Sequence, residues 1–508
     1  MTQDLNKLAG RALMVDVAGD TLTADEASFL RQHHIRAICL FRRNVSNLET
    51  TRKLITDLKA TIGNDVLIGM DQEGGAVMRT LFLPQAPSAM ALGAVGDETL
   101  AYQVGAAVAR GLAALGVNWN YAPVLDLNNN PKNPVIAERS FGADPVKAAR
   151  LAGAWMAGHL GEGVATCVKH FPGHGDTHTD SHLDLPLVNK TRTALEQYEL
   201  SPFHALLKQT PGLMSAHIIF PAFDSTLPAT LSPTILQTLL RDDWGYEGVT
   251  ITDGMNMKAI RERWGQAKGT VMALAAGADL SLVLQFTEEM AAAKQALIDA
   301  VTTGEIHIER LAQADARVSA MAARFSSQQR EYSAEQDAAD RALFARAWAN
   351  ALTLVGYVCR PDLGSKVRLV LQADAPSDGV SEAGLSARVL IEKLAPLYDL
   401  EVVTYQKRSD LDWATLPQDG AFTIVASTTR ERYDNEQHTR WQPNLHLALW
   451  NPYAAGDLAC PALVTYGFAD AALNAVVGWL KGELEATGTL PAALGQVHDL
   501  AAPVMPIP

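Results

Sequence analysis

The amino-acid sequence predicts an α/β protein in which a TIM-like (β/α)8 barrel is followed by a smaller α/β domain built on a layered sheet. Two observations predict this fold. Eight short runs rich in Val, Ile and Leu alternate with amphipathic segments through about residue 325. Near-continuous apolar runs are typical of parallel strands buried on both faces, and eight such units fit one barrel. Further strand-like runs beyond residue 361 predict the second sheet.

We expect the barrel strands at residues 11–17, 35–41, 65–71, 117–127, 164–170, 212–218, 248–253 and 278–284. Segments between them, such as 47–62 and 147–163, place apolar residues three and four positions apart and predict helices. The barrel should occupy residues 1–325, a linker and connecting helix 326–360, and the C-terminal α/β sandwich domain 361–508. Strands of that domain are expected at 367–372, 400–405, 422–427, 445–450 and 462–467.

Charge and composition exclude several classes of function. The 508 residues include 42 Lys and Arg against 56 Asp and Glu, a formal net charge of −14. This balance disfavours nucleic acid and anionic membranes as partners, and no obligate protein partner is evident. The four cysteines are far apart and form no C-x-x-C pair, so we expect reduced, buried thiols. With no basic leader or long apolar stretch, the sequence predicts a cytoplasmic protein.

Ionisable residues gather where the predicted strands end. In a barrel of this type, catalytic groups lie at the carboxyl ends of the strands. An ionisable group that follows a buried apolar run is partly desolvated, and several such groups at one rim point to function. Five strands end in such residues, namely Asp71, Asp126, Lys169 with His170, His217 and Asp253.

The densest polar segment is KHFPGHGDTHTDSHLDLP, at 169–186, which holds four histidines and three aspartates. In a turn, the carboxylate of Asp180 can accept a hydrogen bond from one imidazole nitrogen of His182 and leave the other nitrogen free for acid/base work. Two other interpretations stay open for this loop. It could be a solvated His-rich loop, or a metal site formed by His170, His174, His178 and His182.

The same loop resembles the signature of glycoside hydrolase family 3, in its β-N-acetylglucosaminidase branch, which reads K-H-F-P-G-H-G, a short spacer, then D-S-H. Other motifs of the family follow in order, and GTLP at 488–491 resembles the ending of two-domain members. They are LFRRN (40–44), DQEGGAVMR (71–79), NYAPVLDL (120–127), ERSFG (138–142), LMSAHIIFPAFD (213–224), PATLSP (228–233) and TDGMNM (252–257).

The resemblance implies a retaining exo-β-N-acetylhexosaminidase that needs no cofactor and no metal. Asp253 matches the catalytic nucleophile, and Asp180 with His182 match a dyad in which His182 is the general acid/base. His217 matches a position near the pocket. The family's sugar-binding positions fall on Asp71, Arg79, Arg139, Lys169 and His170.

Two positions depart from the family pattern. Ala76 stands where a basic residue is common, and Gly254 stands where Ala or Asp is more usual. Neither change removes a catalytic group. For a bacterial source, the resemblance implies cytoplasmic recycling of cell-wall muropeptides, while a two-domain member could act on chitin fragments instead.

Alternative functions remain at this point. A β-glucosidase or β-xylosidase of the same family is one, although the D-S-H motif argues against it. A metal-dependent barrel hydrolase that uses the His-rich loop is another. A non-catalytic sugar-binding protein is the third, and the retained nucleophile and dyad argue against it. A contribution of the second domain to the site, through residues 427–437, is also open.

Overall fold

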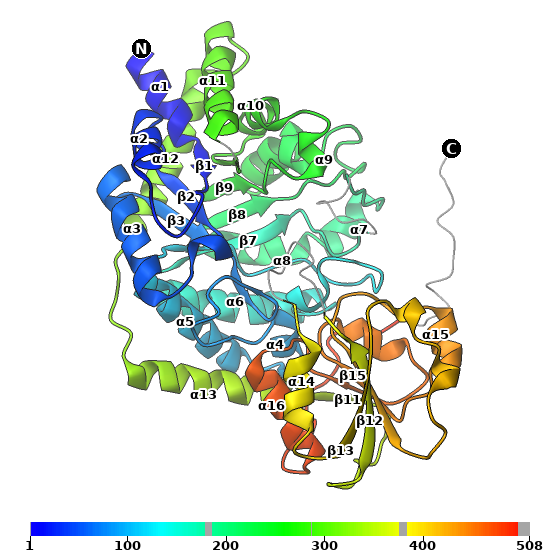
Figure 1. Cartoon of the computed structure of the whole chain (residues 1–508). Helices are drawn as coiled ribbons and strands as arrows, with labels where there is room; N and C mark the ends of the chain where they lie inside the picture. Colours follow the sequence, from blue (N-terminus) through cyan, green and yellow to red (C-terminus); the bar gives the residue numbers. More distant parts are fainter. Residues whose placement is uncertain (1, 178–184, 286, 375–383, 496–508) are drawn as a thin grey trace.

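The computed structural model describes residues 2–177, 185–285, 287–374 and 384–495, and it contains a barrel and a second, separate sheet (Figure 1). The eight barrel strands are β1 (Leu13–Val15), β2 (Ala37–Leu40), β3 (Leu67–Met70), β6 (Trp119–Asn120), β7 (Ala165–Phe171), β8 (Gly212–Ser215), β9 (Val249–Thr252) and β10 (Ser281–Leu282). A small hairpin, β4 (Gln72–Gly74) with β5 (Val77–Met78), follows β3.

The barrel strands are all parallel, in the order β10-β1-β2-β3-β6-β7-β8-β9. The ring closes where Ile251 of β9 bridges to Leu280, next to β10, and the Thr252 amide donates to the Leu280 carbonyl at 3.1 Å. Each strand is buried along its length. The predicted (β/α)8 barrel is therefore confirmed.

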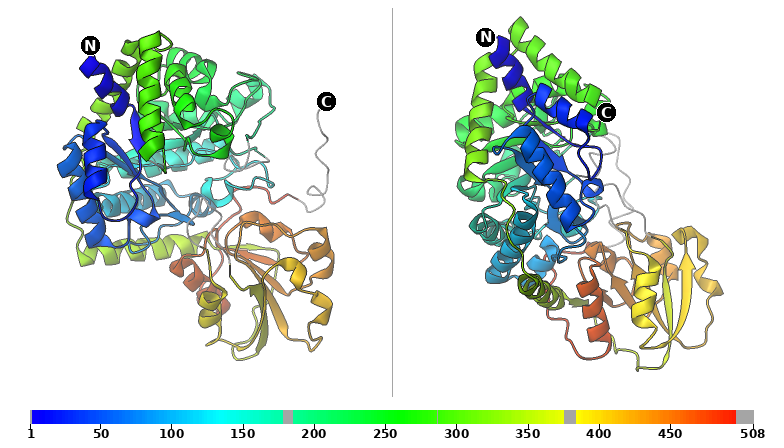
Figure 2. Two further views of the ribbon diagram at one scale, coloured as in Figure 1. Left: turned by 45° about the horizontal axis from the view of Figure 1, so that its top comes forward. Right: turned by 60° about the vertical axis from the view of Figure 1, so that its left-hand side comes forward.

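The helices of the barrel surround the sheet (Figure 2). They are α1 (Thr2–Arg11), α2 (Ala24–Gln32), α3 (Leu48–Ile62), α4 (Ala89–Val95), α5 (Glu98–Leu115), α6 (Pro145–Gly161), α7 (Arg192–Gln197), α8 (Ser201–Leu206), α9 (Lys258–Arg261), α10 (Gln266–Ala276), α11 (Thr287–Thr303) and α12 (Ile308–Arg324). A π-helical segment, η5 (Thr234–Asp243), precedes β9.

Local sequence signals explain where α6 begins and how closely it packs against α5. The side chain of Asp144 caps α6 and Pro145 follows at the first helical position, where the missing N–H is tolerated. Helices α5 and α6 pack closely because Gly105 and Gly158 have no side chain at their contact. A Cβ on Gly105 would lie 2.1 Å from the Trp155 carbonyl oxygen, and one on Gly158 would lie 2.2 Å from the Tyr102 carbonyl oxygen. A side chain at either glycine would force the two helices apart.

Two expectations from the sequence are wrong. The strand expected at 117–127 is short, since β6 comprises only Trp119–Asn120. Pro123 follows closely and has no N–H to donate to a ladder, so the regular pairing ends there. Contact with β7 continues through single contacts: the Cys167 amide donates to the Ala122 carbonyl at 3.0 Å, and Val124 bridges to Lys169. Burial of the cysteines holds for Cys39 and Cys167, but Cys460 is only partly buried, and Cys359 is exposed because it lies beyond the end of β11.

The second sheet has six strands in the order β11-β16-β15-β14-β12-β13, and only β11 is antiparallel to its neighbour. Its strands are β11 (Thr353–Val355), β12 (Lys366–Gln372), β13 (Asp399–Tyr405), β14 (Phe422–Ser427), β15 (Leu445–Ala448) and β16 (Ala462–Val464). Helices α14 (Ala387–Leu394) and α16 (Asp470–Leu480) pack on one face. The segment after α15 (Asn435–Arg440) packs on the other through Trp441.

Helix α13 (Ala334–Ala351) runs along the barrel and leads into the second sheet (Figure 1). It lies in the predicted linker, 326–360, but β11 lies there too and pairs with β16, so the sheet begins before residue 361. An apolar cluster that includes Met90 of α4, Trp348 of α13 and Tyr466 joins the two parts. Among the described helices, none has the length and apolar character needed to cross a membrane.

Candidate active site

A cavity of about 250 Å³ lies at the carboxyl ends of the barrel strands. Strand ends and the loops that follow them supply its walls, as expected for a barrel of this kind. The polar residues among its lining side chains are Asp16, Arg43, Asp71, Glu73, Arg79, Tyr121, Arg139, Lys169, His170, His174, Asp253, Asn256 and Gln285.

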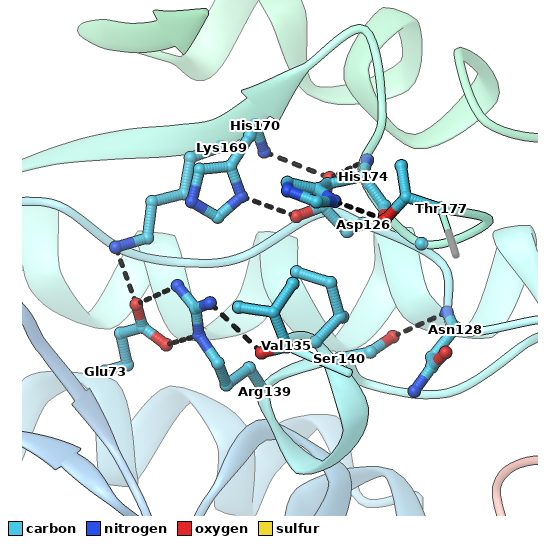
Figure 3. Close-up of polar contacts among 12 residues, drawn as sticks. Glu73, Asp126, Asn128, Val135, Arg139, Ser140, Lys169, His170, His174 and Thr177 are labelled. Carbon is cyan, nitrogen blue, oxygen red and sulfur yellow. Dashed lines mark hydrogen bonds and ion pairs between the residues drawn. The ribbon is translucent and has the colours of Figure 1, made fainter. Parts of the chain in front are cut away.

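Lys169 is the centre of a charged cluster in this cavity. Its Nζ lies 2.6 Å from Asp71 Oδ1 and 2.6 Å from Glu73 Oε1. Arg79 Nη2 reaches the other oxygen of Asp71 at 2.9 Å. Arg139 binds Glu73 through two hydrogen bonds of 2.9 Å, from Nε and Nη2 (Figure 3). Five side chains from β7, the β3–β5 region and the turn η2 (Ala137–Arg139) thus hold one another in fixed geometry.

The charges of this cluster keep every member ionised. Burial alone favours the neutral acids, but Lys169 and Arg79 hold the pKa of Asp71 well below its ordinary value. Burial is likewise outweighed at Glu73, where Arg139 and Lys169 lower the pKa to about 2. Burial lowers the pKa of Lys169, but Asp71 and Glu73 raise it above its ordinary value. At neutral pH the cluster therefore presents charged donors and acceptors to a ligand.

His170 follows Lys169 in β7 and is fixed by a buried carboxylate. Its Nδ1 lies 2.6 Å from Asp126 Oδ2, and the backbone amides of His170 and His174 donate to Asp126 Oδ1 at 3.0 and 2.7 Å. Burial raises the pKa of Asp126, but His170 and these hydrogen bonds lower it below the ordinary value. The Nδ1 contact directs the other ring nitrogen of His170 away from Asp126.

Asp253 follows β9 and lines the same cavity. Its Oδ1 accepts a hydrogen bond of 2.7 Å from the amide of Gly254, which holds the carboxylate against the backbone. His217 does not line the cavity. It is buried behind Gly254, whose carbonyl lies 3.0 Å from His217 Nε2, while Thr230 Oγ1 lies 2.9 Å from its Nδ1. His217 therefore supports the backbone beside Asp253.

Asp180 and His182 lie outside the described residues, and so does His178. The chain that leads to them is well anchored at its beginning: Asn133 Nδ2 donates to the carbonyls of His174 and Gly175 at 2.8 and 3.1 Å. On the far side, the amide of Ile219 donates to the Pro186 carbonyl at 3.0 Å. Both anchors lie beside barrel strands, at the ends of β7 and β8.

Metal-binding geometry was a further possibility for the His-rich loop. Within the described ranges, no group of three or more His, Cys, Asp and Glu side chains could hold a metal ion. His170 and His174 have their rings 5.7 Å apart, and each directs Nδ1 to a protein oxygen, that of Asp126 or of Thr177. Those two nitrogens are thus engaged within the protein.

Sequence reasoning brought most of these residues to one rim but missed several that the cavity contains. Glu73 joins Lys169 to Arg139, and its signal was its place two residues after Asp71, because alternate residues of a strand share a face. Asp16 and Arg43 form an ion pair at the rim. Asp16 is the last but one residue of the first expected strand, as Asp126 is of the fourth, so the rule applied to the other strand ends would also identify it. Asn256 had no such signal.

Comparisons with known proteins agree with this architecture. The glycosyl hydrolase family 3 N-terminal domain matches residues 6–321. A β-hexosaminidase of Alkalilimnicola ehrlichii is 35% identical over 307 residues, which cover 59% of this chain and 88% of that protein. β-Hexosaminidase A of Pseudoalteromonas piscicida is 34% identical over 333 residues, and the match spans only 55% of its length.

A solved structure resembles the chain from end to end. The family 3 β-N-acetylglucosaminidase of a Paenibacillus species superposes with a TM-score of 0.87 at 31% sequence identity, and the match covers 97% of this chain and 99% of that one. The family domain alone occupies more than half of the chain. The chain therefore belongs to glycosyl hydrolase family 3 and is a glycoside hydrolase.

Proposed function

We propose that this glycoside hydrolase is a retaining exo-β-N-acetylhexosaminidase that removes terminal, non-reducing N-acetylglucosamine. One observation carries the proposal: Asp253 lines the same small cavity as the cluster of Lys169, Asp71, Glu73, Arg79 and Arg139. The carboxylate of Asp253 thus shares the cavity with charged groups that can hydrogen-bond a sugar. The end-to-end similarity to a β-N-acetylglucosaminidase supports the choice of sugar.

The size and charge of the cavity support a single neutral sugar as the bound group. Its volume of about 250 Å³ falls below the roughly 300–1,000 Å³ typical of pockets that bind drug-sized ligands. The cations Arg79, Arg139 and Lys169 face the anions Asp71, Glu73 and Asp253, so the formal charges balance. Hydroxyl groups both donate and accept hydrogen bonds and suit such a mixture better than an anion does.

In the proposed mechanism, Asp253 attacks the anomeric carbon while His182 donates a proton to the departing glycosidic oxygen. The bond to the aglycone breaks and a glycosyl ester forms on Asp253. His182 then takes a proton from water, whose oxygen attacks the anomeric carbon and releases Asp253. Two displacements at the same carbon retain its configuration.

A histidine acid suits this cavity on electrostatic grounds. A second carboxyl group beside Asp253 would repel it and raise the pKa of one of the two acids. An imidazole avoids that repulsion and exchanges protons near neutral pH. Asp180 is proposed to hold His182 in the required orientation. The position of His174 in the cavity wall, six residues before Asp180, supports this role.

The remaining residues are proposed to bind the sugar. Asp71, Arg79, Arg139, Lys169 and His170 would hold its hydroxyl groups, and their mutual ion pairs would keep them oriented before the substrate arrives. His217 would act through the Gly254 backbone. All four cysteines are unpaired, in keeping with a cytoplasmic enzyme that acts on muropeptide or chitin fragments.

The test compares aryl β-glycosides that differ only in the sugar. We expect turnover of the N-acetylglucosaminide and little or none of the glucoside or xyloside, with no effect of EDTA. Asp253→Asn should lower kcat on the order of 10³-fold or more, because it removes the nucleophile. The matched control is Asp243→Asn, at an exposed carboxylate at the end of η5, which should keep full activity.

Other results would overturn the proposal. A kcat/KM for the glucoside or xyloside equal to that for the N-acetylglucosaminide would show a different specificity within the family. Loss of activity in EDTA that is restored by a divalent metal would favour hydrolysis by metal-activated water. Full activity of Asp253→Asn would remove the assigned nucleophile.

A further inference from the structure

The second domain contacts the short turn that carries Arg139 into the cavity. Glu138 precedes Arg139 in η2 and points to the other side. Arg430, in the loop after β14, places Nη2 2.6 Å from Glu138 Oε1. Trp450, just after β15, donates to the same oxygen through Nε1 at 3.0 Å. Two residues of the second domain thus bind one carboxylate of the barrel.

The carbonyl of Val135 forms a second connection. Arg139 Nη1 donates to it from the cavity side at 3.3 Å (Figure 3), and Arg430 Nη1 donates to it from the second domain at 2.8 Å. Val135 itself lines the cavity. One backbone oxygen therefore receives a cavity guanidinium and a guanidinium of the second domain.

These groups are shielded from water and held by further contacts. Glu138 is 0% exposed and Trp450 is 1% exposed. The Arg430 guanidinium carbon lies 5.4 Å from the centre of the Trp450 ring, and the Arg430 carbonyl accepts a hydrogen bond of 2.7 Å from Asn451 Nδ2. A buried charge is strongly unfavourable once its partner is removed, so Glu138 cannot easily keep its place without Arg430.

The two ends of Arg139 are held by different parts of the molecule. Glu73 binds its guanidinium inside the barrel. From outside, Arg430 and Trp450 bind the carboxylate of the preceding residue, Glu138, and Arg430 also binds the Val135 carbonyl just before η2. The guanidinium alone could follow Glu73 through a change of side-chain rotamer. A fixed backbone removes that freedom, and sub-ångström placement of a binding group affects rate strongly.

We propose that Arg430 and Trp450 are positioning residues through which the second domain sets the place of Arg139 in the cavity. Neither side chain is among those that line the cavity, so they act through Glu138 and Val135 rather than on the substrate. The proposal rests on the proposed function in that Arg139 is taken to bind the sugar. It makes the second domain a working part of the active site.

The test is a double-mutant cycle on the full chain, with an aryl N-acetylglucosaminide as substrate. Arg430→Met should lower kcat/KM by about 10- to 100-fold, and Arg430→Lys should restore part of the loss because it keeps the charge. Arg139→Lys should also lower kcat/KM, and the share of that loss that appears in KM rather than in kcat should be the same as for Arg430→Met. Combined, the two changes should cost little more than Arg139→Lys alone, because they act through one group.

The matched control is Arg432→Met. Arg432 lies two residues further along the same loop, pairs with the buried Asp457, and also donates to a barrel carbonyl, that of Pro131, at 2.7 Å. It does not bind η2 through any contact of the described residues. If docking of the domain were all that matters, Arg432→Met would lower kcat/KM as much as Arg430→Met, and that result would overturn the proposal.

The proposal would also be overturned if the fold-losses in kcat/KM of Arg430→Met and Arg139→Lys multiplied in the double variant. If Arg430→Met does not fold, Trp450→Phe replaces it in the cycle, because that change removes one hydrogen bond and keeps an aromatic ring. Wild-type turnover is measured first and separates the two claims. An inactive wild type contradicts the proposed function, whereas an active wild type with independent Arg430 and Arg139 contradicts only this inference.

Discussion

At the scale of single residues, the site is organised by Lys169 and its two carboxylate partners. The ammonium group joins Asp71, which Arg79 also binds, to Glu73, which Arg139 also binds. Removing any one member leaves a buried opposite charge without full compensation, which is costly. The cluster thus presents charged groups to the cavity in a fixed arrangement.

Glu73 gives a test of this cluster that does not require catalysis. Its folded-state pKa of about 2 lies below the ordinary 4.5. Its ionised form therefore stabilises the fold above pH 4.5, and this contribution is lost as the pH falls towards 2. We expect Glu73→Gln to lower the free energy of unfolding at neutral pH and to weaken its pH dependence in this window, as measured by urea titrations at a series of pH values.

The control for this prediction is Glu305→Gln, at an exposed glutamate beyond the end of α11. It should behave like the wild type throughout. Equal pH dependence of Glu73→Gln and wild type between pH 4.5 and 2 would show that the ion pairs of Glu73 do not contribute to stability.

The sequence predicts those site residues that the strands position, and it does not predict those that contacts distant in the sequence position. Asp71, Lys169, His170 and Asp253 lie in or directly after buried strands, so the barrel rule places them at one rim. The contact of Arg139 with Glu73 joins residues 66 apart in the chain, and periodicity carries no information about it. The resemblance to family 3 identifies Arg139, whereas Glu73 lies inside the DQEGG motif without a predicted role.

At the scale of elements, the loops after β6 and β7 form one unit clamped by Asn133. Its Nδ2 donates to the carbonyls of His174 and Gly175, and its Oδ1 accepts from the amides of Val135 and Ile136 at 3.0 and 2.8 Å. One buried amide thus connects the turn that precedes Arg139 to the chain that leads towards Asp180 and His182. Loop geometry of this kind depends on contacts distant in sequence, and periodicity could not predict it.

Asn133→Ala should therefore loosen both loops while leaving the barrel intact. We expect faster hydrogen exchange in peptides covering residues 170–186 and a loss of kcat/KM on the order of 10-fold or more. Lys132→Ala, at the neighbouring, half-buried position, should change neither. Faster exchange with full activity would show that placement of these loops does not limit turnover.

Strand lengths show a further limit of sequence reasoning. The apolar run at 117–127 contains only the two-residue β6, because Pro123 cannot donate to the ladder and the chain turns along the rim instead. By contrast, β7 extends over Ala165–Phe171 and matches its expected position closely. Apolar character therefore identified where the strands lie, but hydrogen-bond requirements decided where they end.

At the scale of the whole molecule, the alternation of apolar runs and helices was enough to predict both sheets. It could not predict how they are joined. Trp348 of α13, Met90 of α4 and Tyr466 share one apolar cluster between the two parts, and Ser88 Oγ donates to the Tyr466 carbonyl at 2.8 Å. Through this interface the second domain lies beside the barrel (Figure 2). Arg430 and Trp450 of the second domain contact Glu138, next to Arg139 in the cavity wall.

We propose that Asp253 forms a covalent glycosyl-enzyme, and mass spectrometry can detect that adduct. The full chain is incubated with a fluorinated 2-acetamido sugar that carries an activated leaving group, then digested and mapped. We expect a single sugar adduct on the peptide that contains Asp253, and no adduct in Asp253→Asn. An adduct on another residue, or steady turnover of an aryl N-acetylglucosaminide with no adduct under these conditions, would contradict it.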